Sequence, residues 1–267
     1  VGEIDGRFTQ VRALGADLRP GHEAGAGPSL ELAIGLAQAA ETLRLAEAGG
    51  LAPDIAARRL TWLVAVDDDV FMGIAKLRAL RRCWSTMAQA VGAETAPRVV
   101  AETSRRMLAK RDAYVNLLRN TLAAFAGAAG GADALTVLPF TVSLGLPDRS
   151  ARRMARNTQL ILKDEAGLAR VVDPGGGSFY VENLTDQLAS AAWSTFQELE
   201  RAGGFLALLE SGGLAERIGA QWAERERALA TRREMVTGVS AFPLVDEHAV
   251  ELDPFDPGEL RGALAAA

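Results

Sequence analysis

The stretch TWLVAVDDDVFMGIAKLRALRRCWSTMAQAV, residues 61–91, contains a complete strand–loop–helix unit. Residues 61–66 form a short apolar run rich in β-branched side chains, which favours a buried strand. Three aspartates follow, and apolar residues then recur at helical spacing over residues 70–91. The stretch therefore predicts a strand, a polar loop and an amphipathic helix, in the order typical of parallel α/β proteins.

The same order occurs four times along the chain. The predicted strands read as apolar on both faces, as expected for a sheet covered by helices. Four units fit either an open parallel sheet or half of a closed (β/α)8 barrel, which needs eight strands. The glycines of residues 21–27 lack the dinucleotide spacing, and there is no Walker loop, so neither motif supports a nucleotide-binding sheet. The predicted strands cover residues 9–14, 61–66, 98–102 and 135–142, and the helices that follow them cover residues 30–47, 70–91, 114–126 and 149–162.

Capping residues support the helix assignments. We expect Ser29 to cap the first long helix, with Glu31 in its first turn, and Asp148 to cap the fourth. The run DPGGGS at residues 173–178 predicts a sharp loop. Further helices are expected beyond it over residues 184–202, 205–210 and 214–234, followed by a polar tail.

Composition and charge exclude several classes of protein. The chain has 267 residues, of which 49% are hydrophobic and 24% charged, as in an ordinary globular domain. Its net charge of −5 gives no overall attraction for nucleic acid or an anionic membrane, and no apolar stretch is long enough to span a membrane. One cysteine, Cys83, excludes an internal disulfide and, with no visible signal peptide, predicts a cytoplasmic protein. Cys83 is expected to be a small core residue.

Charged residues near the strand ends could carry chemistry. Asp67-Asp68-Asp69 could bind a divalent cation, but capping of the next helix is favoured because no further carboxylates complete a metal sphere. Two groups of basic residues stand out. The first is interpreted as a solvated helix face and the second as a loop, and for each the alternative is a site for a phosphorylated ligand such as coenzyme A. They are Lys76, Arg78, Arg81 and Arg82, and Arg105, Arg106, Lys110 and Arg111.

The chain has two histidines. His22 follows the first predicted strand and could act as a general acid, or it could be a loop residue bonded to backbone or water. His248 lies in a polar segment and is expected at the surface. Two histidines and one cysteine without cluster spacing predict that this chain has no metal site.

Several stretches together resemble the cobalamin-dependent acyl-CoA mutases, the methylmalonyl-CoA mutase family. The most specific are ARNTQ at residues 155–159 and DPGGGSFYVE at residues 173–182, where the family has ARNTQ and DPWGGSYYVE. EAGA at residues 23–26, IAKLRA at residues 74–79 and GVS at residues 238–240 extend the match. It runs from about residue 14 to residue 243.

The resemblance implies an α/β fold of the (β/α)8 TIM-barrel type, to which this chain supplies about the last four βα units plus C-terminal helices. Residues 1–172 would be the second half of the barrel, residues 173–243 a helical extension packed on it, and residues 244–267 a polar tail. In the family an acyl-CoA threads through the barrel, and adenosylcobalamin generates the radical that rearranges its carbon skeleton. The D-x-H-x-x-G loop of the family's cobalamin domain is missing from this sequence, so the cofactor is expected mainly on a partner chain.

Positions that contact the substrate in active members differ in this chain. Active members have Tyr-His, two residues and then Glu-Ala-Gly, whereas here Gly21-His22 directly precedes that motif, so the tyrosine is missing. The family's Q-T-S-G becomes Glu102-Thr103-Ser104-Arg105, and its L-H-T-N becomes apolar around Leu138. Gly175 replaces the family's tryptophan. These departures resemble the small-subunit pattern, in which a degenerate barrel pairs with a catalytic chain.

Three functional hypotheses follow. The first is a small, non-catalytic subunit in a heterodimer with a large catalytic methylmalonyl-CoA mutase subunit, supporting the interconversion of methylmalonyl-CoA and succinyl-CoA. The second is a catalytic barrel component that receives cobalamin from a separate chain. The third is a generic α/β domain that binds a phosphorylated metabolite at Arg105 and Arg106. For the second, the resemblance offers His22 as the catalytic candidate and, for acyl-CoA binding, Lys76, Arg78, Thr103, Ser104 and Gln159.

Overall fold

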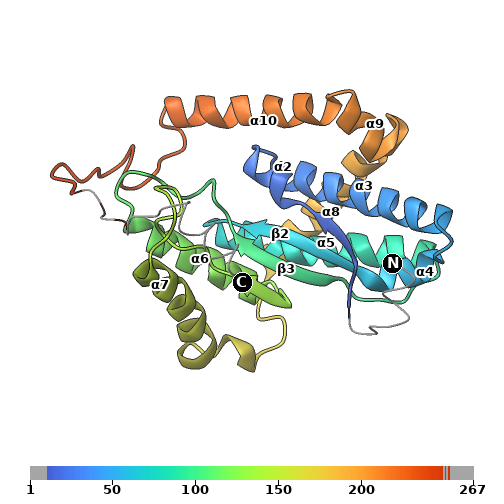
Figure 1. The fold of residues 1–267 in the computed structure, drawn as a ribbon, viewed down its shortest axis with the longest axis horizontal. Helices are drawn as coiled ribbons and strands as arrows, with labels where there is room; N and C mark the ends of the chain where they lie inside the picture. Colours follow the sequence, from blue (N-terminus) through green and yellow to red (C-terminus); the bar gives the residue numbers. More distant parts are fainter. Residues whose placement is uncertain (1–10, 249, 251, 253–267) are drawn as a thin grey trace, which may run out of the picture.

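The computed structural model describes residues 11–248, 250 and 252, and its centre is a four-stranded sheet (Figure 1). All neighbouring strands are parallel and lie in the order β1-β2-β3-β4. The register pairs Thr61 with Arg98 and Val66 with Thr103. The predicted parallel α/β organisation is therefore confirmed. The strands are β1 (Leu14–Asp17), β2 (Leu60–Val66), β3 (Arg98–Thr103) and β4 (Ala134–Thr136).

Two strands differ from the prediction. Residues 9 and 10 of the first predicted strand lie outside the described residues, residues 11–13 are not in a strand, and β1 begins at Leu14. The last strand stops at Thr136 instead of residue 142. There, side chains take up the backbone groups that a strand would need: Asn120 donates to the Leu138 carbonyl at 2.8 Å, and Asn116 to the Phe140 carbonyl at 3.0 Å. Apolar composition alone could not reveal these competing hydrogen bonds.

Helices connect the strands and continue beyond the last one. The four long helices expected after the strands are present, and two short helices, α2 and α4, were not predicted. The helix expected over residues 149–162 ends in a π-helical turn and a short 3-10 turn. The elements are α2 (Arg19–Glu23), α3 (Pro28–Ala48), α4 (Pro53–Arg59), α5 (Val70–Ala90), α6 (Val115–Ala129), α7 (Arg149–Leu160), η1 (Ile161–Glu165), η2 (Leu168–Arg170), α8 (Phe179–Arg201), α9 (Gly204–Glu210) and α10 (Gly213–Ala230).

Helix caps confirm two predictions and correct two. Asp148 caps α7 by accepting from the Ala151 N–H, and Asp69 caps α5 by accepting from the Met72 N–H. Ser29 does not cap α3, because that helix starts at Pro28, two residues before the predicted residue 30, with proline at its first position. Ser178 caps α8 and so starts it five residues before the predicted residue 184.

The two faces of the sheet have different surroundings. On one face Trp62, Val64 and Val99 are fully buried beneath the helices. The alternate residues point to the other face, where Arg98 and Thr136 are exposed. This second face still carries the apolar Leu63 and Val100 near its centre, but the prediction of a sheet covered by helices is wrong for it. In Figure 1 the sheet lies in front of α5 and α8.

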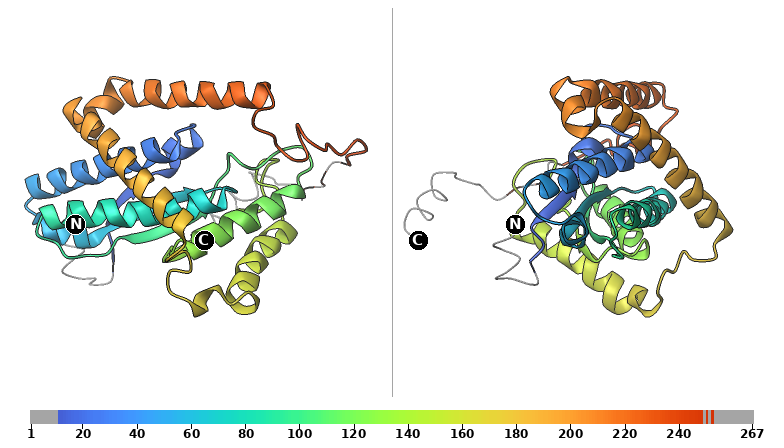
Figure 2. Two further views of the ribbon diagram at one scale, coloured as in Figure 1. Left: turned by 180° about the vertical axis from the view of Figure 1, so that it is seen from behind. Right: turned by 90° about the vertical axis from the view of Figure 1, so that its right-hand side faces the viewer.

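The core lies between the sheet and the helices on its covered face. Trp62 of β2 and Trp84 of α5 make an edge-to-face contact with ring centroids 5.2 Å apart. Helix α8 packs along both α3 and α5, as the rear view in Figure 2 shows, and adds Phe196 and Leu199 to the same core. Cys83 belongs to this core as predicted, and burial raises the pKa of its thiol to about 11. Among residues 11–248, no helix combines the length and apolarity needed to cross a membrane.

Helix α10 lies over the carboxyl ends of the strands as a separate arm (Figure 1). Its Gln221 side chain accepts from the Gly27 N–H at 2.7 Å. Trp222 packs against Gly25, where a Cβ would lie 2.7 Å from the Trp222 Cβ. Gly25 also has a φ of +114°, which side chains rarely adopt. The arm therefore depends on a glycine at residue 25.

Gly25→Ala is expected to lower the free energy of unfolding by about 1–3 kcal/mol and to displace Trp222. Both the backbone conformation and the contact with α10 oppose the new methyl group. Urea unfolding gives the free energy, and the tryptophan emission spectrum reports the displacement. Gly50→Ala is the matched control, because Gly50 also has a positive φ, +85°, but no atom lies within 4 Å of an added Cβ. Equal losses and unchanged emission in both variants would contradict the proposed packing.

Candidate functional site

A buried group of polar side chains lies where β1, β2 and β3 end, and we call it the strand-end cluster. It consists of His22 from α2, Glu31 from α3, Asp67 after β2, Lys76 from α5 and Ser104 after β3. His22 is 1% exposed, Lys76 3% and Ser104 0%. The carboxyl ends of parallel strands are where such folds usually place their sites.

Glu31 is the centre of the cluster. Its carboxylate accepts from Lys76 Nζ at 2.8 and 3.0 Å and from His22 Nδ1 at 2.9 Å. With the proton on Nδ1, His22 Nε2 accepts from the Ser104 hydroxyl, 2.8 Å away. Ser104 Oγ in turn accepts from the Arg106 N–H at 3.2 Å. Both imidazole nitrogens are thus used within the protein.

Electrostatics keep the cluster ionised. Burial alone would raise the pKa of Glu31, but the charge of Lys76 and the hydrogen bonds from His22 and Lys76 outweigh burial, and the pKa is lowered from its usual 4.5. Asp67 shows the same balance. Burial raises its pKa, but Lys76, His22 and Arg106 lower it by more, so the pKa is also below its usual value. The two carboxylates therefore stay charged at neutral pH and balance the buried cations.

The lowered pKa of Glu31 predicts a stability loss in acid. A folded-state pKa below the unfolded value means that the stabilisation is fully present above the unfolded pKa and is lost as the pH falls through the folded pKa. We expect the free energy of unfolding to decrease between about pH 5 and pH 3, as measured by urea unfolding. The decrease should be shallower in Glu31→Gln. Parallel pH profiles of the two proteins would show that Glu31 is not the group responsible.

A second set of contacts joins the loops that follow β1 and β3. The Glu23 carboxylate accepts from the backbone N–H groups of Arg105 and Arg106 at 2.9 and 2.8 Å. Arg106 Nη1 donates in return to the carbonyls of His22 and Ala26 at 2.7 and 3.0 Å. Arg106 is only 11% exposed and also pairs with Asp67. Its guanidinium therefore holds the protein's own loops.

The structure brings together four of the six predicted site residues. His22, Lys76 and Ser104 belong to the strand-end cluster, and the neighbouring Thr103 hydroxyl accepts from the Leu138 N–H at 2.9 Å. Arg78 lies elsewhere on α5 and pairs with Asp173 of the loop before α8 and with Glu182 in the first turn of α8. Gln159 lies on α7, beside a separate cavity of about 440 Å³.

Sequence reasoning missed the partners in this cluster. His22 is neither free nor bonded only to backbone or water, because Glu31 and Ser104 hold its ring. Lys76 is not on a solvated face, unlike Arg82 of the same group, which is 61% exposed. The sequence pattern indicates for Glu31 only a favourable interaction with the helix dipole. One signal could have revealed the pairing. A lysine such as Lys76 within an apolar helix face would be buried, and a buried lysine requires an acidic partner. His248 is exposed as predicted.

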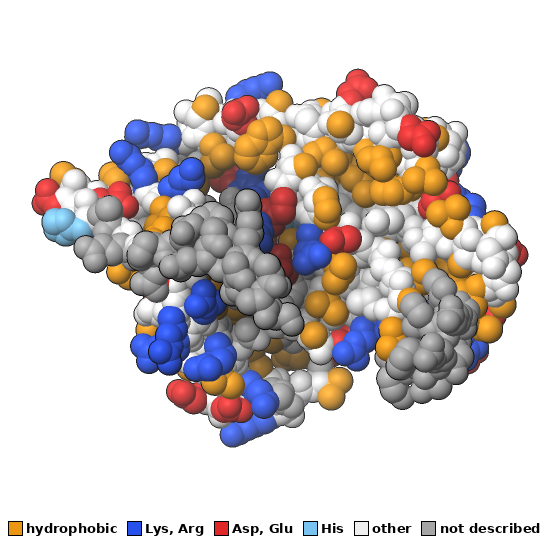
Figure 3. All heavy atoms as spheres, in the orientation of Figure 1, with side chains coloured by type: hydrophobic (Ala, Val, Ile, Leu, Met, Phe, Trp, Pro, Cys, Tyr) orange, Lys and Arg blue, Asp and Glu red, His pale blue; other side chains and the backbone are white. Residues whose placement is uncertain are grey.

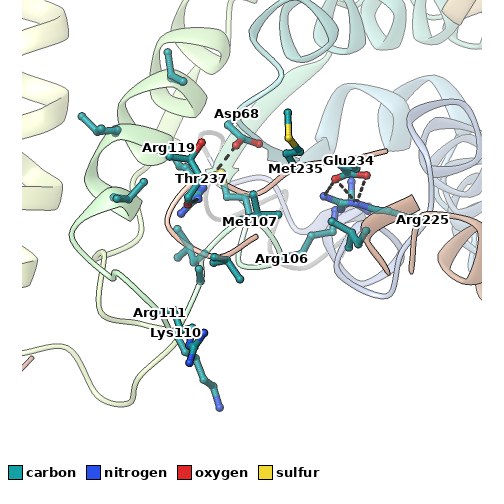
Figure 4. A pocket seen from close by; sticks show the side chains of 18 of the residues that line it. Asp68, Arg106, Met107, Lys110, Arg111, Arg119, Arg225, Glu234, Met235 and Thr237 are labelled. Carbon is teal, nitrogen blue, oxygen red and sulfur yellow. Dashed lines mark hydrogen bonds and ion pairs between the residues drawn. The ribbon is translucent and has the colours of Figure 1, made fainter. Parts of the chain in front are cut away.

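Two hollows separate the cluster from α10. One of about 750 Å³ is lined by Asp67, Arg106 and the α10 residues Gln221 and Arg225. The other, of about 570 Å³, lies between α6 and α10 (Figure 4). In Figure 3 acidic and basic side chains lie side by side in the hollow near the centre of the visible face. Over the part of the chain that the structure describes, His, Cys, Asp and Glu side chains form no group able to hold a metal ion.

The fold and this site define a parallel α/β protein whose strand ends are closed by a buried ionic cluster beneath a helical arm. The methylmalonyl-CoA mutase family model matches residues 7–266. The chain therefore belongs to the methylmalonyl-CoA mutase family.

Known relatives include both small subunits and mutases named without a subunit. The chain is 52% identical over 250 residues to the methylmalonyl-CoA mutase small subunit of Streptomyces virginiae, covering 93% of this chain and 41% of the relative. It is 40% identical over 258 residues to the small subunit of Propionibacterium freudenreichii subsp. shermanii, covering 95% and 40%. A methylmalonyl-CoA mutase of Rhizobium meliloti is 37% identical over 246 residues, covering 90% and 34%. The chain thus spans about two fifths of the length of its small-subunit relatives.

Proposed function

We propose that this chain acts in the small, non-catalytic subunit of a methylmalonyl-CoA mutase. In this role it supports the adenosylcobalamin-dependent interconversion of methylmalonyl-CoA and succinyl-CoA by a large partner chain, in a cytoplasmic heterodimer. The higher identity to proteins named small subunits, 52% against 37% for the Rhizobium meliloti mutase, supports this role.

The internal pairing of the strand-end cluster is the observation that carries the proposal. A general acid must come within about 2.6–3.2 Å of the atom that it protonates. His22 is 1% exposed, and its two ring nitrogens already face Glu31 and Ser104. Lys76 donates to Glu31 and is 3% exposed. These side chains stabilise the fold and are not positioned to meet a substrate.

The uncovered face of the sheet supports a half-barrel architecture. Purely parallel sheets are almost always covered on both faces. Here Arg98, Ala134 and Thr136 are exposed on one face. Closure by four more βα units would turn this face into the interior of a (β/α)8 barrel. We therefore assign residues 1–172 to the second half of the barrel, 173–243 to the helical extension packed on it and 244–267 to a polar tail.

An ionic contact crosses this open face at the carboxyl ends of the strands. Arg19 pairs with Asp17 at the end of β1, at 2.9 Å, and reaches Glu102 of β3 at 3.4 Å. It therefore extends across β2, which lies between those strands. In a closed barrel this arginine would occupy the interior through which an acyl-CoA would have to pass. That position also supports a non-catalytic role.

The residues of this chain do not fit a cobalamin site. Coordination of cobalt by imidazole requires an accessible ring nitrogen. His22 is buried with both nitrogens occupied, the exposed His248 lies in the polar segment away from the strand-end cluster, and the described residues offer no group of metal-binding side chains. We therefore place the cofactor on the partner chain and assign no step of the reaction to this one.

Calorimetry with methylmalonyl-CoA tests the non-catalytic role directly. The isolated chain is expected to show no binding in the micromolar range, because Lys76, Thr103 and Ser104 are occupied and Arg78 and Gln159 lie apart from them. Micromolar binding that is lost in Arg78→Ala would instead support the alternative, a catalytic barrel component that receives cobalamin from a separate chain. Glu182→Gln removes one partner of Arg78 and leaves the arginine in place, so it serves as the control.

A further inference from the structure

The hollow between α6 and α10 has an apolar wall that is open to solvent. Tyr114, Leu118 and Leu122 lie four residues apart on one side of the start of α6; the two leucines line the hollow, and the Tyr114 ring, which stacks on Phe140, continues the stripe beyond it. They are 61%, 66% and 46% exposed. Met235 and Trp222, which line the same hollow, are 68% and 38% exposed. Apolar surface gathered in this way gains about 25 cal/mol per Å² when it is covered, so it marks a contact surface.

The same hollow carries an excess of positive charge. Five of its lining residues are cationic and two are acidic, although the whole chain has a net charge of −5. Figure 4 shows the two acids already in use: Asp68 faces Arg119, and Glu234 pairs with Arg225. The remaining cations are Arg106, Lys110 and Arg111.

Among the described residues, Lys110 and Arg111 are the cations of this hollow that have no acidic partner. Arg106 is held by Asp67 and by backbone carbonyls. Lys110 and Arg111 are exposed, and neither has an acidic partner among residues 11–248. They belong to the loop that leads into α6, next to the apolar stripe. The surface thus combines an apolar stripe with two adjacent positive charges that the described residues leave without an acidic partner.

We propose that this surface, Tyr114, Leu118 and Leu122 with Lys110 and Arg111, docks an acidic amphipathic helix of the large partner chain. The proposal rests on the proposed small-subunit function and adds the location of the contact. The partner helix lays apolar side chains along the α6 stripe and places carboxylates beside Lys110 and Arg111. From Tyr114 to Leu122 the helix rises by eight steps, about 12 Å, which matches about two turns of a partner helix.

Charge argues against a second copy of this chain as the occupant. A twofold contact places the same patch on both sides of the interface. Lys110 and Arg111 would then face the same residues of the other copy, and like charges would oppose association. An acidic segment from a different chain satisfies both the charge and the apolar stripe.

The test compares variants in binding to a purified large methylmalonyl-CoA mutase chain by biolayer interferometry. Lys110→Glu/Arg111→Glu should weaken the affinity at least tenfold, mainly through slower association, and the defect should shrink as the salt concentration rises. Leu118→Ser/Leu122→Ser should weaken it at least tenfold at every salt concentration, through faster dissociation. Both leucines are largely exposed, so these variants should keep the wild-type unfolding midpoint.

Lys163→Glu/Arg201→Glu makes the same charge change away from this surface and should bind like the wild type. Binding of all variants with wild-type affinity would overturn the docking surface while leaving the small-subunit function intact. Failure of the wild type itself to bind would overturn both. If light scattering shows a homodimer of this chain that Leu118→Ser/Leu122→Ser dissociates, the occupant is a second copy and the proposal is wrong.

Discussion

Replacement of Glu31 by glutamine is expected to lower the free energy of unfolding by about 3–5 kcal/mol, because it removes one partner of a buried ion pair. The carboxylate is enclosed and accepts from both Lys76 and His22. Glutamine has nearly the same shape but carries no charge, so the Lys76 ammonium would remain buried without a counter-ion. Urea unfolding monitored by circular dichroism measures the loss.

Two further variants make this prediction specific. Glu47→Gln makes the same chemical change at an exposed position near the end of α3 and should alter the free energy of unfolding by less than about 0.5 kcal/mol. Glu31→Gln/Lys76→Met removes both charges and should cost less than the sum of the two single changes. Additive losses would mean that Glu31 and Lys76 do not stabilise each other.

Trp84→Ala is the second large expected effect, with a loss of about 3–5 kcal/mol in the free energy of unfolding. Trp84 is fully buried and packs edge to face against Trp62, so truncation leaves a cavity between α5 and β2. Urea unfolding again provides the measurement.

Trp84→Phe separates ring packing from ring polarity. The Nε1 atoms of Trp84 and Trp62 are buried without a hydrogen-bond partner. Phenylalanine keeps an aromatic ring and removes one unsatisfied donor, so its cost should be well below that of alanine. If phenylalanine and alanine destabilise equally, the contact between the two rings is not what stabilises this part of the core.

The parallel α/β fold could be predicted because composition, capping residues and hydrophobic periodicity indicate the same strands and helices. In residues 61–91 the apolar run, the aspartate cap and the helical periodicity all agree, and β2 and α5 lie within one residue of the expected bounds. The end of β4 could not be predicted, because the side chains of Asn116 and Asn120 in α6 bond to the backbone that follows this strand. The uncovered face was missed because a single polar residue, Arg98 or Thr136, does not interrupt a short strand pattern.

The sequence predicted where several site residues lie, but not which side chains they contact. Sequence placed His22 and Ser104 after strands, and the structure brings them within 2.8 Å of each other. Their burial, and the pairing of Lys76 with Glu31 across 45 residues of chain, depend on how α2, α3 and α5 pack. A sequence pattern cannot distinguish a lysine that meets a substrate from one that meets a glutamate of its own fold.

Mutase activity is the most direct test of the proposed role. Methylmalonyl-CoA turnover would be measured with added adenosylcobalamin for this chain alone and after mixing with a large mutase chain, alongside size-exclusion chromatography of the mixture. A supporting subunit predicts no turnover by the chain alone and co-elution with the large chain, with turnover only in the mixture. Turnover by the chain alone would contradict the account, because His22, Lys76 and Ser104 would then have to leave their internal partners and act on the substrate.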